Sequence, residues 1–459
     1  TNLIDLAGHY HALYQENALL EEQPANYAEA LHWYNEFLAS FPEDEQSPGI
    51  NYQLADLLLE HGDFGESARQ YERTAYDYPA HERASEAGYA AIYAHRQNLE
   101  AVDGAEVPTA KLATVESSLR FAQTFPDHEH AATVLGAAAE DLYAMQDHER
   151  AISSGRWLIG TYPEAPAELL RATWQIVAHA TFDTALYADA EEGYAQVLAL
   201  TDQEDEARQS VVDNLAAAIY KQGEQARALE DYAAAAGHFL RVKSAAPGSE
   251  IRPSAEYDAA ASLIHLEDWL AAAEVLEDFR STFPEHELNS DATRQLAVVY
   301  ENAGELARSA AEYEQVAQDA DDPAVRREAI LIAGDLYEQA GSEDEALRVY
   351  EGYIDEFTEP LETALEIRFK VAGMYDARSS EDAYLEQLKA IVDIDALAGE
   401  ARSDRTRYLA AQSALVLTKP LYAEFVALQL TQPFEESLAA KKVLMSEALS
   451  GFESLVGYG

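Results

Sequence analysis

The chain has 459 residues and carries 84 Asp and Glu against 31 Lys and Arg, which gives a formal net charge of −53. Nucleic acids and anionic lipid surfaces attract positive charge, so this balance argues against both as partners. Hydrophobic residues make up 48% of the sequence and cysteine is absent, so the chain has ample apolar surface to bury but no disulfide and no thiolate chemistry. No apolar run approaches the roughly 18 residues that a membrane span requires.

The acidity has two interpretations. Acidic residues are spread along the whole chain, and Lys is scarce, with 8 Lys beside 23 Arg. This pattern favours adaptation to high salt, because salt screens the repulsion between dispersed charges. An acidic groove that attracts a basic partner or cations is the alternative, and the sequence leaves both open.

A short motif returns along the chain: an aromatic residue followed by proline at the end of an amphipathic helix. It occurs at Phe41-Pro42, Tyr78-Pro79, Phe125-Pro126, Tyr162-Pro163 and Phe283-Pro284. The prolines are 37, 47, 37 and 121 residues apart, and the last interval is roughly three repeat lengths. Self-similarity at this period predicts a solenoid of stacked helical repeats.

Residues 51–79 show one repeat clearly. Apolar side chains predict a first helix that ends at Gly62-Asp63, where a left-handed residue is expected. Ala68, Tyr71 and Ala75 are spaced along one face of a second helix, which stops before Pro79. The same pattern returns in 259–284, 296–313 and 333–353. The interval of 47 residues is explained by a longer loop predicted at 98–107.

The repeat spacing fades after about residue 400. Long helical stretches are expected at 401–418, 420–430 and 434–455, separated by prolines. We therefore expect two repeat arrays, residues 1–250 and 251–400, followed by a tail of long helices, residues 401–459. We also expect the tail to be a trimmed end and the parent polypeptide to continue with more repeats.

On these residues the chain resembles the tetratricopeptide repeat over about residues 20–400. Small residues stand where the two helices of a hairpin cross, and proline follows the second helix. The tryptophan expected early in the first helix is mostly missing, and several units exceed the usual length of roughly 34 residues. The resemblance implies an all-α, right-handed superhelical solenoid of about ten antiparallel helix pairs. It also implies a non-catalytic scaffold for protein–protein interaction.

Two further resemblances imply a cellular setting. The spacing of aromatic residues in 37–42 and 279–284 is similar to the repeats of bacterial outer-membrane assembly lipoproteins and the Tol-Pal coordinator family. The tail from Tyr408 to Phe434 resembles large proteobacterial repeat proteins that accompany TonB/ExbB/ExbD-type systems. These resemblances imply a periplasmic protein, anchored by a removed N-terminal segment, with energy-transduction or outer-membrane components as partners. A cytoplasmic location is the alternative.

The sequence predicts no catalytic, cofactor-binding or metal-binding residues. His9 and His11, and likewise His128 and His130, are two residues apart, which places their side chains on different faces of a helix. The acidic runs lack the spacing and the glycine of a calcium loop, and no phosphate-binding loop or nucleophile elbow is present. We interpret the histidines as solvated or packing residues.

The tyrosines are expected to pack in the core, as at Tyr34, Tyr71, Tyr313 and Tyr350. Partner-binding candidates lie instead on the first helix of each hairpin, whose outward face lines the inner curve of a superhelix, where an acidic surface would hold a peptide or helix. They are Tyr52, Asp56, Glu60, Tyr257, His265, Arg294, Glu301, Asn302, Asp335, Glu338 and Gln339.

Two alternative functions stay open. The chain binds a small molecule or glycan if its tryptophans, Trp33, Trp157, Trp174 and Trp269, are exposed for stacking on sugars. It is a regulatory region of a larger protein if the parent gene also encodes a catalytic domain. Buried indoles would favour the scaffold.

Overall fold

The computed structural model describes residues 2–16 and 21–458. Within these ranges the chain consists of helices and short connections, without a strand. The helices are α1 Asn2–Gln15, α2 Gln23–Ser40, α3 Ser47–His61, α4 Phe64–Tyr76, α5 Ala84–Ala101, α6 Val107–Thr124, α7 Ala131–Ala144, α8 His148–Thr161, α9 Ala167–Asp183, α10 Tyr187–Ala199, α11 Arg208–Ala228, α12 Tyr232–Ala245, α13 Arg252–His265, α14 Trp269–Thr282, α15 Asn289–Asn302, α16 Leu306–Asp319, α17 Pro323–Gln339, α18 Glu343–Glu356, α19 Leu361–Ala377, α20 Glu381–Leu397, α21 Asp404–Ala427 and α22 Phe434–Val456.

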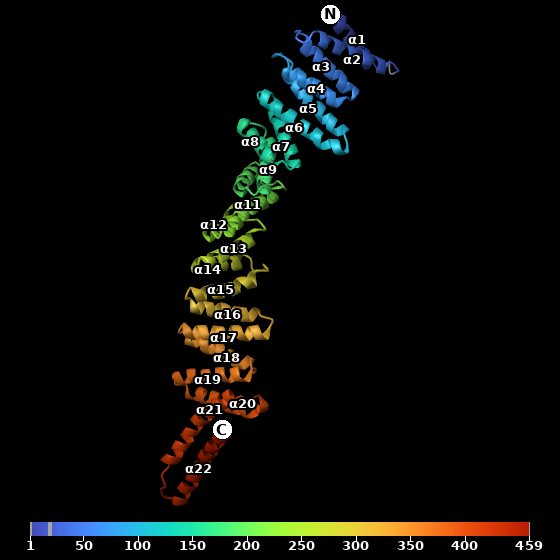
Figure 1. Cartoon of the computed structure of the whole chain (residues 1–459). Coiled ribbons are helices and arrows are strands. Elements are labelled where there is room, and N and C mark those ends of the chain that lie inside the picture. Colours follow the sequence, from blue (N-terminus) through green and yellow to red (C-terminus); the bar gives the residue numbers. More distant parts are fainter. Residues whose placement is uncertain (1, 17–20, 459) are drawn as a thin grey trace. The chain divides into compact units, whose positions relative to one another are not determined.

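The helices form two compact units. Unit 1 comprises Thr1–Gln225 and Arg241–Arg252, and unit 2 comprises Ala226–Leu240 and Pro253–Gly459. From α1 to α10 in unit 1, and from α14 to α22 in unit 2, each helix packs against the next in chain order (Figure 1). The predicted all-α array of antiparallel helix pairs is confirmed, with eleven pairs among the described residues against about ten expected. The domain boundaries predicted at residues 250 and 400 stay predictions.

The turn inside a hairpin depends on one residue with a left-handed backbone. Gly62 ends α3 with φ of 91°, as predicted, and Gly304 and Gly341 follow α15 and α17 with φ of 78° and 74°. Glycine has no Cβ and adopts this conformation without steric cost, so the helix stops there and the chain can reverse.

The turn between hairpins explains the aromatic–proline motif and several histidines. At the end of α6 the Phe125 N–H donates to the Phe121 carbonyl at 2.8 Å, and the next residue, Pro126, has no N–H with which to continue the helix. Two residues later, Nδ1 of His128 accepts from the N–H of His130 at 3.2 Å. The same position is filled by His81, His286 and Asp44, which accept from Arg83, Leu288 and Gln46 at 3.3, 3.2 and 2.9 Å. Histidine therefore takes the place of aspartate as a turn acceptor.

Close helix crossings occur at small residues, as the tetratricopeptide resemblance implies. A Cβ atom on Gly193 of α10 would lie 2.8 Å from the Cβ atom of Ala178 in α9. A Cβ atom on Gly334 of α17 would lie 2.8 Å from Cζ of the Tyr350 ring in α18. Tyr34, Tyr71 and Tyr350 are buried as predicted, and Tyr313 is half-buried against the same core as Tyr350.

Two glutamates on second helices tie their hairpin to the next one. Glu314 of α16 accepts a hydrogen bond from Tyr337 of α17 at 2.9 Å and two from Arg348 of α18 at 2.7 and 2.9 Å. The equivalent set one hairpin earlier is Glu277, Tyr300 and Arg308. We call these two sets the glutamate bridges. Each glutamate joins three successive helices, so these charged residues act in stacking the repeats.

Two local predictions were wrong. Helix α5 continues to Ala101, so most of the loop expected at 98–107 is helical and only a short 3-10 turn, Gly104–Glu106, precedes α6. Pro420 lies inside α21 and does not divide it. A proline removes only one helical hydrogen bond, and the packing of α21 along α22 holds both halves in one helix.

Candidate partner-binding surface

The first helices of three successive hairpins in unit 1 line a hollow of about 710 Å³. Its aromatic lining consists of Tyr52 from α3, Tyr89 and Tyr93 from α5, and His128 and His130 from the turn before α7. We call it the tyrosine hollow. Tyr89 and Tyr93 are four residues apart, so both project from the same face of α5, opposite the buried Ala87, Ala91 and Ala94.

Two tyrosine rings of the hollow are exposed, and one of them, Tyr89, is held by a neighbouring histidine. Tyr89 is 40% exposed and Tyr93 is 54% exposed. The Tyr89 ring stacks on His130 with centroids 4.4 Å apart, and His128 packs edge-on against the buried Phe121 at 5.0 Å. Large aromatic side chains held in place and left open to solvent are well suited to bind an apolar anchor of a partner.

Two glutamates stand at the edge of this aromatic floor. Glu86 and Glu129 line the hollow and are exposed, and the Glu129 side chain is 83% accessible. The one arginine in the lining, Arg96, lies 3.5 Å from Asp141, so its charge is partly balanced within the chain. Burial first, and then the nearby Asp56, raises the pKa of Tyr52, which therefore stays neutral at physiological pH. The hollow thus has an aromatic base and two exposed glutamates at its rim, and the Arg83 guanidinium lies 5.1 Å from the centre of the Tyr52 ring.

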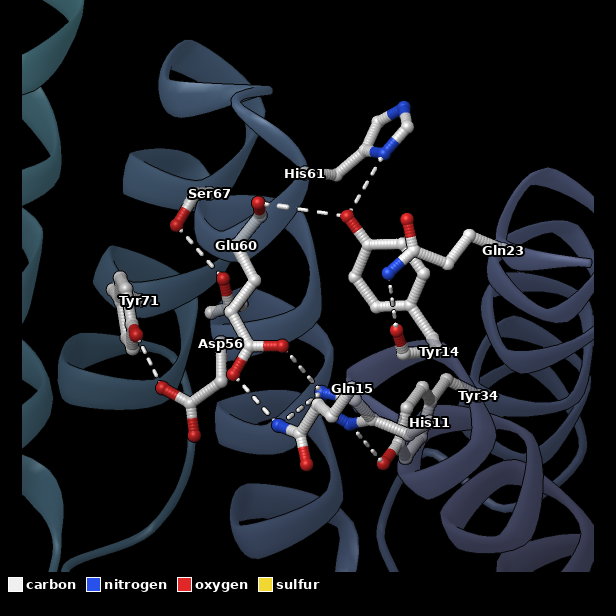
Figure 2. Close-up of polar contacts among 11 residues, drawn as sticks. His11, Tyr14, Gln15, Gln23, Tyr34, Asp56, Glu60, His61, Ser67 and Tyr71 are labelled. Carbon is white, nitrogen blue, oxygen red and sulfur yellow. Dashed lines mark hydrogen bonds and ion pairs between the residues drawn. The ribbon is translucent and has the colours of Figure 1, made fainter. Parts of the chain in front are cut away.

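Next to Tyr52 on α3, the predicted residues Asp56 and Glu60 hold neighbouring helices together. The Tyr71 hydroxyl of α4 donates to Asp56, and burial raises the pKa of this carboxyl. Figure 2 shows Glu60 facing α1, where it accepts from Gln15 at 2.7 Å and from Nε2 of His11 at 3.2 Å. These carboxylates therefore have structural partners, and a role in binding stays a prediction for both.

Hydrogen bonds of His11 attach the first hairpin, α1 and α2, to α3. The Tyr34 hydroxyl of α2 lies 3.0 Å from Nδ1 of His11, whose Nε2 donates to Glu60, so a chain of hydrogen bonds runs from α2 through α1 to α3 (Figure 2). His61 stacks on Tyr27 with centroids 3.6 Å apart. Aromatic and histidine side chains here act as connectors between helices.

In unit 2, α13 and α15 line a second hollow of about 410 Å³. It brings together the predicted residues His265 and Arg294 with Ile264 and the 48% exposed Val298. We call it the valine hollow. The His265 ring stacks on Tyr232 with centroids 4.4 Å apart. This smaller and more apolar surface has the same origin as the tyrosine hollow, because both are made by the first helices of adjacent hairpins.

Four other predicted residues are not among the residues that line the tyrosine hollow or the valine hollow. Tyr257 accepts a hydrogen bond from Gln295, and Glu301 and Asn302 are exposed at the end of α15. Gln339 is exposed near the end of α17. A role in partner binding stays a prediction for these four residues.

Asp335 and Glu338 meet a lysine of the following hairpin. Nζ of Lys370 on α19 lies 2.8 Å from Asp335 and 2.6 Å from Glu338, and it donates to the Tyr350 hydroxyl at 2.7 Å. Burial lowers the pKa of Lys370, but these three hydrogen bonds outweigh burial and raise it overall. The lysine is therefore charged, and it offsets one of the two negative charges of the predicted acidic pair.

Sequence reasoning missed Tyr89, Tyr93, His128 and His130. The signal for the tyrosines was present, because two aromatic residues four apart lie opposite an alanine stripe in the same helix. The histidines gave no comparable signal, since their place depends on the turn geometry after Pro126.

All four tryptophans are half-buried, and Trp157 lines a separate hollow of about 530 Å³ on α6 and α8.

Neither metal ligation nor membrane insertion is indicated by the described residues. In residues 2–16 and 21–458, no three His, Asp or Glu side chains lie close enough together to hold a metal ion. Across the same part of the chain, no helix combines the length and the apolar character needed to cross a bilayer.

No family model matches the chain, and no curated protein matches it. Solved structures with similar folds include a tetratricopeptide repeat protein from Parabacteroides merdae, with 14% sequence identity, a TM-score of 0.24, and coverage of 62% of this chain and 98% of that one. The type IV pilus biogenesis factor PilW has 14% identity and a TM-score of 0.23, covering 50% of this chain and 96% of that one. The Naa15/Naa10 complex bound to HypK-THB has 13% identity and a TM-score of 0.34, covering 100% of this chain and 66% of the matched one.

Proposed function

We propose that this chain is a non-catalytic protein–protein interaction scaffold of the bacterial cell envelope, and that its tyrosine hollow is a primary binding site. The observation that carries the proposal is the hollow itself: exposed Tyr89 and Tyr93 on one face of α5, flanked by Tyr52 and by a rigid turn. Solenoids built from helix pairs offer extended surfaces of this kind for recognition by shape.

The chemistry of the hollow indicates the class of partner. Its aromatic base favours an apolar or aromatic anchor, and exposed Glu86 and Glu129 favour a Lys or Arg beside that anchor. The net charge of −53 strengthens this preference at low ionic strength. The partner is therefore an extended peptide or a helix of another protein with an apolar anchor and a neighbouring cation.

The first experiment places a photo-reactive amino acid at Tyr93 and, as a matched control, at Leu112 on α6, which is 40% exposed outside the hollow. Cross-linking is performed in the source organism at its native salt concentration. We expect cross-linked proteins from position 93 that are absent from position 112. Identical products at both positions would contradict a specific site.

The same cross-linked products test the proposed location in the cell envelope. Recovery of energy-transduction or outer-membrane components would support a periplasmic scaffold, whereas recovery of only cytosolic proteins would refute the envelope location and leave the hollow intact as a site. With the partner's peptide in hand, Tyr93→Ala is expected to weaken binding by roughly 2 kcal/mol, about 30-fold, if Tyr93 is a hot spot. Leu112→Ala is expected to leave the affinity unchanged.

One observation favours a second candidate function, the binding of a glycan or polar small molecule. Trp157 lines the hollow on α6 and α8 together with polar side chains, Glu116, Gln123 and Ser153. An indole beside hydrogen-bonding groups is a suitable platform for a sugar ring. Titration of envelope oligosaccharides against tryptophan fluorescence, with Trp157→Phe as the control, tests it. An unchanged spectrum with every sugar would eliminate this candidate.

A further inference from the structure

Helices α21 and α22 form a hairpin whose apolar surface is largely uncovered. Of the 25 large apolar side chains exposed among the described residues, 11 lie in 404–456. Within Phe434–Val456, all of which the structure describes, Ala448 is the one fully buried residue. Helices in proteins normally gain most of their stability from burying an apolar face against other elements. In this hairpin of two helices, the second of 23 residues, most of the apolar surface of α22 is not buried by α21.

The exposed residues form a continuous patch. On α22, Phe434, Met445, Leu449, Phe452 and Val456 lie within about 60° of one another around the helix axis. On α21, Tyr408, Leu415, Tyr422 and Val426 follow one another at intervals of 7, 7 and 4 residues, so they also share one face. The two stripes meet where the Tyr422 and Phe452 rings are in contact, with centroids 5.8 Å apart. We call these nine residues the tail stripe.

The hairpin beneath the stripe is well defined. α22 approaches α21 closely at Gly451, where a Cβ atom would lie 2.7 Å from the Thr418 side chain. Near the loop between the helices, Nζ of Lys441 donates to the Leu428 carbonyl at 2.7 Å and lies over the Phe425 ring. Figure 1 shows α21 leaving α20 and α22 returning toward it. The tail stripe is thus a surface on a formed helix pair.

The net charge of the tail indicates which partner can cover the tail stripe. Residues 401–459 contain six acidic and six basic side chains and are neutral, so the net charge of −53 belongs to residues 1–400. Two copies of the chain repel each other over their acidic repeats, but they can meet at this neutral hairpin without that cost. Two helix pairs with apolar stripes at heptad spacing are also the components of a four-helix bundle.

We infer that the tail stripe is a homodimer interface, in which the hairpins of two copies pack as a four-helix bundle about a two-fold axis. This inference is independent of the proposed function, because it concerns other residues. Nine half-exposed side chains offer on the order of 600 Å² per copy, against about 800 Å² in a standard interface. This area is at the lower end of specific interfaces, so we expect a dimer that dissociates on dilution.

Sedimentation velocity over a concentration series, at both low and molar salt, tests the inference. Val426→Lys and Leu449→Lys place a charge in the stripe at positions that are 56% and 51% exposed. The matched control is Val443→Lys, which is 57% exposed on the opposite side of α22. Circular dichroism verifies that each variant remains folded.

We expect the wild type and Val443→Lys to dimerise alike, and each stripe variant to raise the dimer Kd by roughly tenfold or more. A wild type that stays monomeric at every concentration and salt would overturn the inference. Such a result would mean that a further segment of the polypeptide or another protein covers the stripe. A dimer that survives both stripe variants, or that is lost equally in Val443→Lys, would overturn it as well.

Discussion

Gly334 tests whether the repeats depend on close helix packing. A Cβ atom at this position in α17 would lie 2.8 and 2.9 Å from Cζ and Cδ1 of the Tyr350 ring, and it would contact Cε1 even more closely. Real Cβ atoms essentially never approach a neighbour to less than 3.0 Å, so in Gly334→Ala the ring has to shift. The shift is costly because Tyr350 is fully buried and its hydroxyl is held by Lys370 at 2.7 Å.

The magnitude follows from two opposing effects. Replacing a helical glycine by alanine favours the helix by about 1 kcal/mol. Overpacking a core costs about 1–3 kcal/mol, and loss of a hydroxyl hydrogen bond adds about 1 kcal/mol. Gly352 in the adjacent helix α18 provides the control, because a Cβ atom there meets nothing within 4 Å. Gly352→Ala should therefore stabilise by about 1 kcal/mol and Gly334→Ala should destabilise by about 1–3 kcal/mol.

The assay has to report on α17 and α18 separately, because repeat arrays do not unfold in a single cooperative step. Hydrogen exchange measured by mass spectrometry on peptides from these two helices meets this need. Urea at constant salt is the suitable denaturant, since guanidinium would also screen the negative charge. Slower exchange in Gly334→Ala, equal to that in Gly352→Ala, would refute the close contact between Gly334 and Tyr350.

Three further predictions concern charge and hydrogen bonding. A double-mutant cycle with Glu314→Gln and Tyr337→Phe should give a coupling energy of about 1 kcal/mol in the hydrogen exchange of peptides from α16 and α17, and additive effects would argue against the glutamate bridge. A hydrogen bond to Glu351, together with burial, raises the pKa of Tyr375 from the ordinary value for tyrosine, about 10, to about 12. The neutral phenol is thus favoured in the folded state, and the stability it contributes is present below about pH 10 and lost as the pH rises toward about 12. Urea midpoints should fall less over this range in Tyr375→Phe, and an identical decline would contradict the assignment. Finally, the thermal unfolding midpoint should increase from low to molar salt because of the net charge of −53, whereas a constant midpoint would exclude salt adaptation.

The fold was predictable because its signals are local. The aromatic–proline motif, the glycine after α3 and the spacing of alanines each act within one helix or one turn, and a period in the sequence repeats them. Burial of Tyr71 and Tyr350 follows from the same periodicity. Pro420 was misread because the rule that proline breaks a helix is also local, whereas α21 is kept whole by packing with α22.

The candidate site was less predictable because it depends on which residues of separate hairpins meet. Position on a first helix did select Tyr52 and the pair His265 and Arg294, which line the two hollows. Position on a first helix does not predict the ion pair between Asp335 and Lys370, which lie 35 residues apart in the sequence. Contacts between hairpins are fixed by the crossing of helices, and composition alone does not encode that geometry.

The acidity of the chain and the shape of its hollows are expected to govern different steps of binding. Many of the few cations are paired with carboxylates between helices, as Arg348 is with Glu314, so the excess of acid is spread over the surface. Such a field attracts any basic partner and raises the association rate, but it distinguishes poorly between partners. Selectivity then has to come from contacts such as those of Tyr93, which act on dissociation. Increasing salt should therefore slow association with little effect on dissociation, and Tyr93→Ala should accelerate dissociation at every salt concentration. If salt and Tyr93→Ala changed the same rate constant, charge and shape would not be separate determinants, and the tyrosine hollow would lose its role in specificity.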